Sequence, residues 1–105
     1  MKVLLDAYVP RPLRRFLPAL TVHTAQEMGW GQLKNGALLR EAEAQFDAFI
    51  TTDKNLIHQQ NTIGSKLAIL VLPTNDWSAI RTKTDEIAAR VTALKSTDFI
   101  ELNWD

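Results

Sequence analysis

Short runs of apolar residues alternate along the chain with longer segments in which apolar residues recur every three or four positions. The short runs predict buried strands, and the longer segments predict helices with one apolar face. The predicted strands are residues 3–5, 21–24, 48–51, 67–72 and 99–104. The predicted helices are residues 10–17, a short helix through residues 26–28, residues 35–46, and one long helix over residues 77–94.

Local signals support these boundaries. Pro10 and Pro12 suit a first helical turn. The side chains of Asn35 and Asp76 are of the type that caps a helix N-terminus. The nearly continuous apolar run at residues 67–72 is typical of a strand covered on both faces. Because strands and helices alternate, we expect one α/β domain over residues 1–105. Its open, mostly parallel sheet has about four to five strands, the last of them at an edge, with helices on both faces.

Composition narrows the class of protein. A hydrophobic fraction of 46% and a charged fraction of 23% indicate a folded domain. The absence of cysteine excludes a disulfide scaffold, a thiolate nucleophile and a cysteine-based zinc site. No apolar run approaches the roughly 20 residues of a membrane span, and an acid at position 6 comes too early for a signal peptide. We therefore expect a cytoplasmic protein without a membrane segment.

The charge balance is neutral, with 12 basic and 12 acidic residues and a pI of about 6.7. Dedicated nucleic-acid-binding domains are usually basic. A metal-dependent nuclease is still compatible with this balance, because it keeps acids at its centre and needs positive charge only locally.

Three polar residues are expected at one edge of the predicted sheet. Asp6 follows the first strand, Asp53 lies two residues past the third, and Asn35 begins the helix reached from the second. Ligand sites in such sheets form beyond the carboxyl ends of the strands. Hard oxygen ligands of this kind bind Mg²⁺ or Mn²⁺. Each residue alone also fits a turn or a helix cap, and their predicted convergence favours a site.

The order of motifs over residues 1–72, roughly two-thirds of the chain, resembles the DUF5615 family of PIN-like proteins. The motifs are Leu4-Leu5-Asp6 followed by Pro10, Gly29-Trp30, Asn35-Gly36 with Leu38-Leu39 and Ala42-Glu43, Ile50 to Leu56, and Gln59-Gln60-Asn61. The resemblance implies a three-layer α/β/α fold whose acidic rim holds a divalent metal and hydrolyses RNA. Many PIN proteins are toxins of toxin–antitoxin pairs, so it also implies a small antitoxin protein as partner.

Carried over by position, Asp6 matches the first acid of the family and Asp53 the acid after the third strand. Two positions depart from the pattern. Typical members have Glu after the first Asp, where this chain has Ala7, and often Asp where it has Asn35. An Asn carbonyl can still bind a hard cation but brings no charge, so we expect weak binding of Mg²⁺ or Mn²⁺. Glu41 or Glu43 is either a further carboxylate of the site or a solvated helix residue.

Polar residues after the third strand are further candidates. Lys54 is either a contact to a phosphate or to transition-state charge, or a surface turn residue. Gln59, Gln60 and Asn61 form an unusual run of adjacent amides. They either order their loop through backbone hydrogen bonds or contact sugar and phosphate groups.

Three arginines follow the Asp6 strand. Arg11, Arg14 and Arg15 either steer a phosphate backbone toward the rim or form a solvated helix face. Trp30, between two glycines, either stacks on a base or fills the core.

Three functions are consistent with these residues. The first is a metal-dependent ribonuclease, with Asp6 and Asp53 as metal ligands, Asn35 as a weaker ligand or orienting group, and Lys54 as a phosphate contact. The second is a catalytically degenerate module that binds RNA or a partner protein without cleavage. The third, a phosphoacceptor domain using Asp53, is disfavoured because such domains carry paired acids after the first strand, where this chain has Ala7. The edge strand over residues 99–104 also allows homo-oligomerisation.

Overall fold

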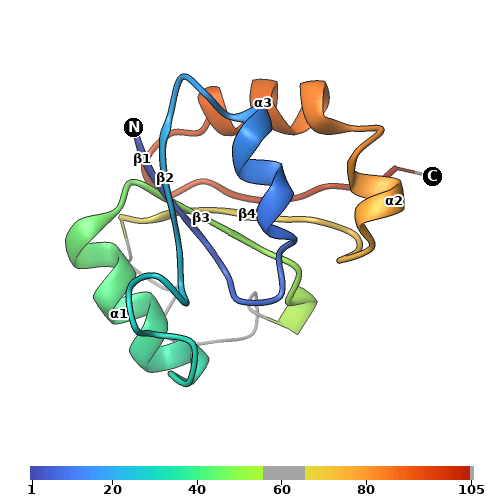
Figure 1. The fold of residues 1–105 in the computed structure, drawn as a ribbon. Helices are drawn as coiled ribbons and strands as arrows, with labels where there is room; N and C mark the ends of the chain where they lie inside the picture. Colours follow the sequence, from blue (N-terminus) through green and yellow to red (C-terminus); the bar gives the residue numbers. More distant parts are fainter. Residues whose placement is uncertain (56–65, 105) are drawn as a thin grey trace.

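The computed structural model describes residues 1–55 and 66–104, and within them five parallel strands form one sheet flanked by helices (Figure 1). The strands are β1 (Lys2–Leu5), β2 (Thr21–Thr24), β3 (Ala48–Thr51), β4 (Ala68–Val71) and β5 (Phe99–Glu101). The helices are the 3₁₀ helix η1 (Arg11–Phe16) and the α-helices α1 (Asn35–Gln45), α2 (Trp77–Ile80) and α3 (Thr84–Thr92). The strand order is β2-β1-β3-β4-β5, and every neighbouring pair is parallel. This arrangement confirms the predicted α/β class with its parallel sheet.

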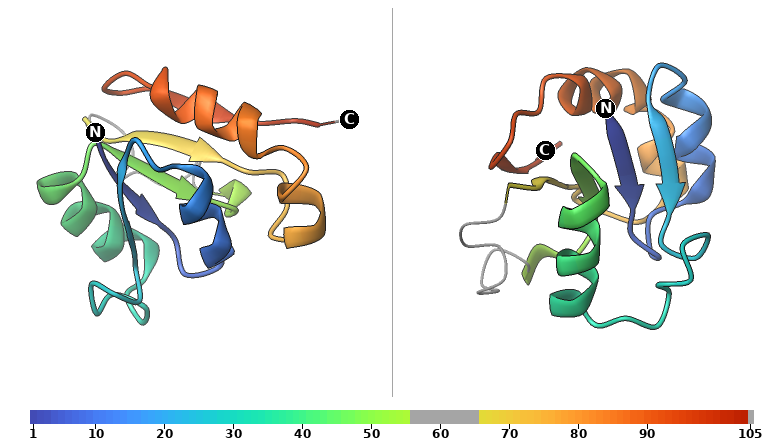
Figure 2. Two further views of the ribbon diagram at one scale, coloured as in Figure 1. Left: turned by 45° about the horizontal axis from the view of Figure 1, so that its top comes forward. Right: turned by 90° about the vertical axis from the view of Figure 1, so that its left-hand side faces the viewer.

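The sheet is covered on both faces, which gives three layers (Figure 2). Val3 and Leu5 of β1 pack into the core beneath η1, α2 and α3, whereas Leu4 between them packs into the core beneath α1. Successive side chains of a strand point to opposite faces, so a strand buried on both sides must be apolar at every position. This requirement accounts for the short uninterrupted apolar runs that predicted β1, β3 and β4.

The path of the chain positions a site between β1 and β3. The connection from β1 to β2 runs through η1 on one face, and the connection from β2 to β3 runs through α1 on the other. The strand order therefore reverses at β1, with β2 on one side and β3 on the other. In open α/β sheets, ligands bind outside the carboxyl ends of the strands at such a switch point. The residues that follow β1 and β3 are Asp6 and the segment that leads to Asp53.

The long helix predicted over residues 77–94 is wrong, because the chain forms α2 and α3 with a turn between them. The Thr82 hydroxyl donates to the Ala79 carbonyl at 2.7 Å, and the Lys83 N–H donates to the Ile80 carbonyl at 2.8 Å. A hydroxyl bonded to its own turn competes with continued helix. Both helices bury apolar residues in the same core, so the apolar pattern is continuous across the break. The predicted cap at Asp76 is confirmed, since its Oδ1 accepts from the Ser78 N–H at 3.0 Å.

The short helix predicted through residues 26–28 is a single turn instead. The Thr24 N–H donates to Glu27 Oε1 at 2.9 Å, and the Glu27 N–H donates to Thr24 Oγ1 at 3.1 Å. This reciprocal pair starts a helical turn. Gly29, with φ of +76°, ends it at once, because the left-handed conformation cannot continue a helix.

Two boundaries also differ from the predictions. Asn35 is the first helical residue of α1, and the N-cap is Lys34, whose carbonyl accepts from the Leu38 N–H at 2.9 Å. The last strand is shorter than predicted and ends at Glu101, although Leu102 still donates its N–H to the Val71 carbonyl at 2.9 Å. It lies at the edge of the sheet, as predicted. In residues 1–55 and 66–104, no helix is both long enough and apolar enough to cross a membrane.

Candidate active site at the carboxyl edge of the sheet

Asp6 is a buried carboxylate at the end of β1. Its side chain is only 8% exposed. Oδ1 accepts a hydrogen bond from the Ala7 N–H at 2.8 Å, and Oδ2 accepts one from the Thr51 hydroxyl at 2.7 Å. The Asp6 N–H also donates to the Ile50 carbonyl at 2.9 Å, which continues the pairing of β1 with β3. Backbone and side chain of Asp6 are therefore both attached to β3.

Thr51 links the two acids that the sequence singles out. It is the last residue of β3 and is fully buried. While its hydroxyl donates to Asp6, the same oxygen accepts from the Asp53 N–H at 3.1 Å. Asp53 Oδ1 in turn accepts from the Asn55 N–H at 2.9 Å, which folds the segment after β3 into a tight turn. One hydroxyl thus sets the position of the turn that carries Asp53 relative to the carboxylate of Asp6.

Asp6 and Asp53 line a common pocket of about 410 Å³. The other lining residues are Ala7, Tyr8, Trp30, Gly31, Gln32, Leu33, Leu38 and Thr52. The predicted convergence of the two acids is therefore present in the structure. The pocket combines an acidic part, supplied by the ends of β1 and β3, with aromatic and aliphatic residues before and within α1.

The donor set of the pocket suits a small hard cation. Each oxygen of Asp6 accepts one hydrogen bond from the described residues, and a carboxylate oxygen has two acceptor positions. Mg²⁺ is commonly held by one or two carboxylates while water and substrate phosphates complete its octahedron. Among the described residues, no group of three or more His, Cys, Asp or Glu side chains could surround a metal ion. Any metal here would depend on Asp6 and Asp53 together with non-carboxylate oxygens.

The other predicted ligands take different positions. Asn35 begins α1, and its chain neighbours Leu33 and Leu38 both line the pocket, so the start of this helix lies at the same edge. Glu41 and Glu43 are both exposed. Glu43 lines a separate hollow of about 480 Å³ near the chain start, together with Met1, Phe46, Asp47, Lys66, Leu94, Lys95 and Ser96. Neither glutamate lines the Asp6 pocket.

Lys54 is exposed and lines another hollow, with Pro73, Glu101, Leu102 and Asn103, on the β5 side of the edge. The structure therefore does not bring it into the pocket of Asp6 and Asp53. The predicted contacts at Gln59, Gln60 and Asn61 lie outside the described residues.

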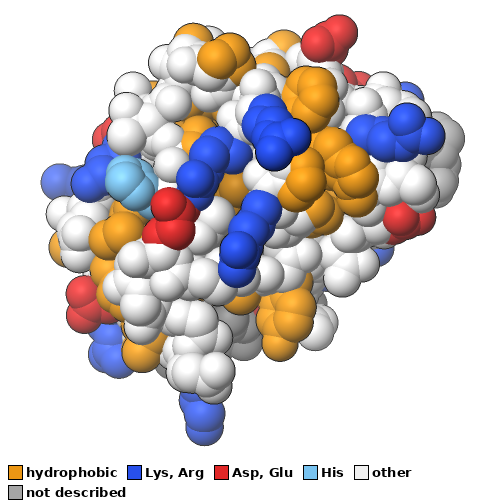
Figure 3. Space-filling view, in the orientation of Figure 1, with side chains coloured by type: hydrophobic (Ala, Val, Ile, Leu, Met, Phe, Trp, Pro, Cys, Tyr) orange, Lys and Arg blue, Asp and Glu red, His pale blue; other side chains and the backbone are white. Residues whose placement is uncertain are grey.

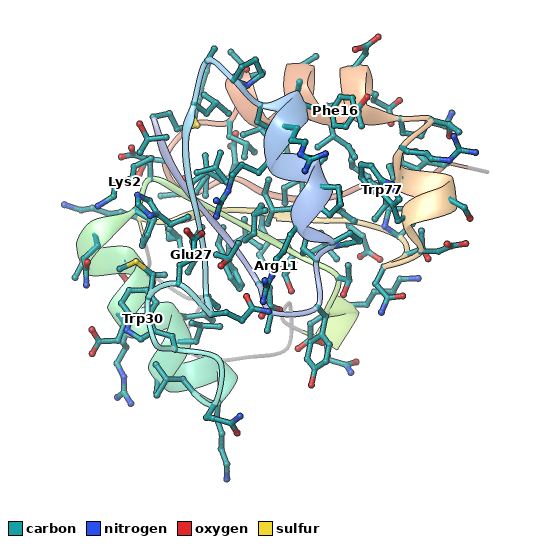
Figure 4. The ribbon with its side chains drawn as sticks, viewed as in Figure 1. Lys2, Arg11, Phe16, Glu27, Trp30 and Trp77 are labelled. Carbon is teal, nitrogen blue, oxygen red and sulfur yellow. The ribbon has the colours of Figure 1, made fainter. Side chains whose placement is uncertain are left out.

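The three arginines form a basic hollow on η1, which we call the arginine hollow. Arg11, Arg14 and Arg15 line it with Pro12, and its volume is about 240 Å³. Figure 3 faces η1 and shows basic side chains gathered over this helix, with hydrophobic side chains beside them. Arg14 forms an ion pair with Glu27, whereas Arg11 and Arg15 are exposed. Arg11 lies at the end of η1 nearest the carboxyl edge of the sheet (Figure 4).

The aromatic residues at the pocket differ in their environments. Trp30 is half-buried, and its ring meets Phe46 edge to face with the centroids 6.0 Å apart, as a residue packed against the core does. Tyr8 is 73% exposed. Sequence analysis overlooked Tyr8 and Thr51. The only sequence signal for a place in the site was proximity to the two acids: Tyr8 lies two residues after Asp6, and Thr51 lies two residues before Asp53.

Comparison with known proteins adds no family assignment. No family model matches the chain, and neither curated proteins nor solved structures provide a match.

Proposed function

We propose that the protein is a metal-dependent ribonuclease of PIN-like type, which hydrolyses RNA phosphodiesters at the pocket of Asp6 and Asp53. The observation that carries this proposal is the shared pocket at the switch point between β1 and β3. One of its two carboxylates is 8% exposed and is held by a fully buried hydroxyl. Burying a charged group is costly unless it is hydrogen-bonded and paired with an opposite charge. Asp6 accepts two hydrogen bonds, and a bound cation would supply the opposite charge.

The side chains of the protein would act mainly by holding the metal ion and the RNA in place. Asp6 and Asp53 would hold Mg²⁺ or Mn²⁺, and Asn35 at the start of α1 would be a weaker ligand or an orienting group. A bound divalent ion would supply Lewis-acid chemistry and a more acidic water for attack on phosphorus. Thr51 fixes the carboxylate plane of Asp6 before substrate arrives, so little reorganisation is needed during reaction. Arg11 and Arg15 would attract the phosphate backbone from the arginine hollow.

The resemblance to PIN proteins supports two further parts of the proposal. The protein would be the toxin of a toxin–antitoxin pair, and a small antitoxin protein would inhibit it. A cytoplasmic location follows from the same proposal, because its RNA substrate is there. Lys54 would contact a phosphate only if the bound RNA extends from the pocket toward β5, because Lys54 lies on that side.

The test combines metal binding with cleavage. Calorimetry with Mn²⁺ and with Mg²⁺ would compare the wild type, Asp6→Asn, Asp53→Asn and the double variant. Asp85→Asn is the matched control, because Asp85 is an exposed acid in the first turn of α3. We expect weak binding that disappears in the double variant and persists in the control. We also expect Mn²⁺-dependent cleavage of single-stranded RNA that Asp6→Asn abolishes in a folded protein.

Cleavage that Asp6→Asn leaves unchanged would contradict the proposal. RNA binding without cleavage at any metal concentration would instead support the degenerate binding module. The sequence feature that favours this alternative is the loss of acids at Ala7 and Asn35.

The strand order 2-1-3-4-5 also occurs in doubly wound domains that bind ligands between β1 and β3. It is therefore compatible with a phosphoacceptor role for Asp53. Ala7, where such a domain would carry a second acid, argues against this role. If small phosphodonors fail to phosphorylate Asp53, the phosphoacceptor role is excluded.

A further inference from the structure

Tyr8 is an aromatic residue at the pocket that the fold does not bury. At 73% exposure it is the most exposed of the large hydrophobic side chains in residues 1–55 and 66–104. It lines the same pocket as Asp6 and Asp53. An exposed aromatic ring contributes little to stability, since burial of its apolar area is what stabilises a fold. Its position beside the acids leaves the ring accessible to a ligand that enters the pocket.

The backbone around Tyr8 is held in place. The Ala7 carbonyl accepts from Gln26 Nε2 at 3.0 Å, and the Ala7 N–H donates to Asp6. Val9 is 3% exposed and donates its N–H to the Asp6 carbonyl at 3.0 Å. Tyr8 is thus presented to solvent between two anchored neighbours. A ring carried by an anchored backbone needs no ordering of the main chain when a ligand binds, which lowers the entropic cost of the contact.

Tyr8 has acidic residues near it in the pocket and basic residues near it in the arginine hollow. The pocket contains the carboxylates of Asp6 and Asp53. Arg11 lies three residues after Tyr8, so their Cα atoms are at most about 11 Å apart. Arg11 is the first residue in the lining of the arginine hollow. A ligand that covers Tyr8 therefore meets an aromatic ring with positive charge nearby and a potential cation site beyond. A single strand of RNA has matching parts, because each nucleotide joins a flat base to a phosphate.

We propose that Tyr8 is a stacking platform for an unpaired base of single-stranded RNA, next to the phosphodiester at the pocket. This inference rests on the proposed function and adds to it a contact that holds an unpaired base beside the cleavage site. The phosphates on the far side of the stacked base reach Arg11 and Arg15. Stacking on an aromatic ring tolerates all bases, because each has a π-face, so the platform selects unpaired structure rather than sequence. An apolar segment of a partner protein is the competing occupant, and it would not use the arginine hollow.

The test measures binding separately from cleavage. The probe is a fluorescent single-stranded oligouridine, followed by anisotropy in the Asp6→Asn background and in metal-free buffer. The variants are Tyr8→Ala, Tyr8→Leu and Tyr8→Phe, and a blunt RNA duplex is the second probe. Because Tyr8 is exposed, we expect all three Tyr8 variants to retain the Tm of their Asp6→Asn parent, which is measured for each.

We expect Tyr8→Ala and Tyr8→Leu to raise the Kd for the single strand roughly fivefold to a hundredfold, the range for loss of one base–aromatic stack. Tyr8→Phe keeps the ring and should keep the Kd within about twofold. Binding to the duplex should change by about twofold or less in every variant, because its bases are not available for stacking.

Equal loss of affinity for both probes, or an unchanged Kd for the single strand in Tyr8→Ala, would overturn the inference. So would full affinity in Tyr8→Leu, which would indicate a generic apolar contact, and so would absence of any binding to the single strand. Failure of the nuclease proposal has a different signature. Wild-type protein would then bind the single strand through Tyr8 but cleave nothing with Mn²⁺.

Discussion

The hydroxyl of Thr51 offers the sharpest test of how the site is built. Thr51→Val replaces this hydroxyl with a methyl group of similar size. Oδ2 of Asp6 then loses its donor at 2.7 Å, and the Asp53 N–H loses its acceptor at 3.1 Å. A hydrogen bond to a charged group contributes about 1.5–3 kcal/mol, and an orphaned buried partner adds to that loss. Since Asp6 is only 8% exposed, water can replace little of the lost bond.

We therefore expect Thr51→Val to lower the free energy of unfolding by about 2–3 kcal/mol. Thr51→Ser is the matched control, because it keeps the hydroxyl and removes one methyl group, at a cost of about 1 kcal/mol. Urea unfolding would measure both, and the slope of each transition shows whether two-state behaviour is kept. A double-mutant cycle with Asp6→Ala, which removes the acceptor, would assign the difference to the Asp6 contact, with a coupling energy of about 1 kcal/mol or more.

If Thr51→Val cost no more stability than Thr51→Ser, or if the cycle showed no coupling, the Thr51 hydroxyl would not stabilise the Asp6 carboxylate. The same variants test the link from structure to function. If Thr51 orients the Asp6 carboxylate for a cation, Thr51→Val should also weaken Mn²⁺ binding, whereas Thr51→Ser should retain it. Loss of stability with unchanged Mn²⁺ affinity would show that Thr51 acts on the fold alone.

Two further predictions rest on contacts in the structure, and a third rests on the proposed function. Asp76→Ala removes the cap bond to Ser78 and should cost about 1 kcal/mol in urea unfolding; a loss below about 0.3 kcal/mol would contradict the cap's role. Gly29→Ala should cost about 1 kcal/mol through its φ of +76°, because no atom within 4 Å would meet the added Cβ. Gly31→Ala, which would meet only Gln26 Cγ at 3.8 Å, should be nearly neutral, and equal losses would refute the backbone explanation. Finally, a non-cleavable RNA analogue should raise the affinity for Mn²⁺, and by linkage Mn²⁺ should raise the affinity for the analogue by the same factor in paired titrations.

The strands were predictable because a strand buried on both faces is a short, continuous run of mainly apolar residues in the sequence. Ala48 to Thr51 forms β3 as predicted, and the turn chemistry after it placed Asp53 at the carboxyl edge. The parallel topology then brought Asp53 to the pocket of Asp6. This part of the site follows from strand ends, so it could be inferred without coordinates.

Other features depend on contacts that spacing does not reveal. The break at Thr82 is hidden because Ile80 and Ile87 continue the same apolar stripe across it. In the sequence, Thr51 resembles any polar residue at a strand end. Its hydrogen bond to Asp6 lies one position beyond Leu5 and Ile50, the last pair of β1 and β3. The exposure of Tyr8 depends on whether a neighbouring element covers it. The sequence places Arg14 on a polar helix face. It does not reveal the ion pair with Glu27, which lies in the turn that follows β2.

That ion pair changes how charge is distributed around the proposed substrate path. Glu27 offsets the charge of Arg14, so the arginine hollow presents mainly Arg11 and Arg15 to an approaching anion. The pocket itself carries Asp6 and Asp53, which would repel a phosphodiester unless a divalent cation lies between them and it. A cation with two charges would balance these two carboxylates, leaving the positive field of the arginines unopposed. Under the proposed function, a chain with no formal net charge could then bind a polyanion through local separation of charge. A third acid in place of Ala7 would hold the metal more tightly but would restore a net negative charge beside the phosphate.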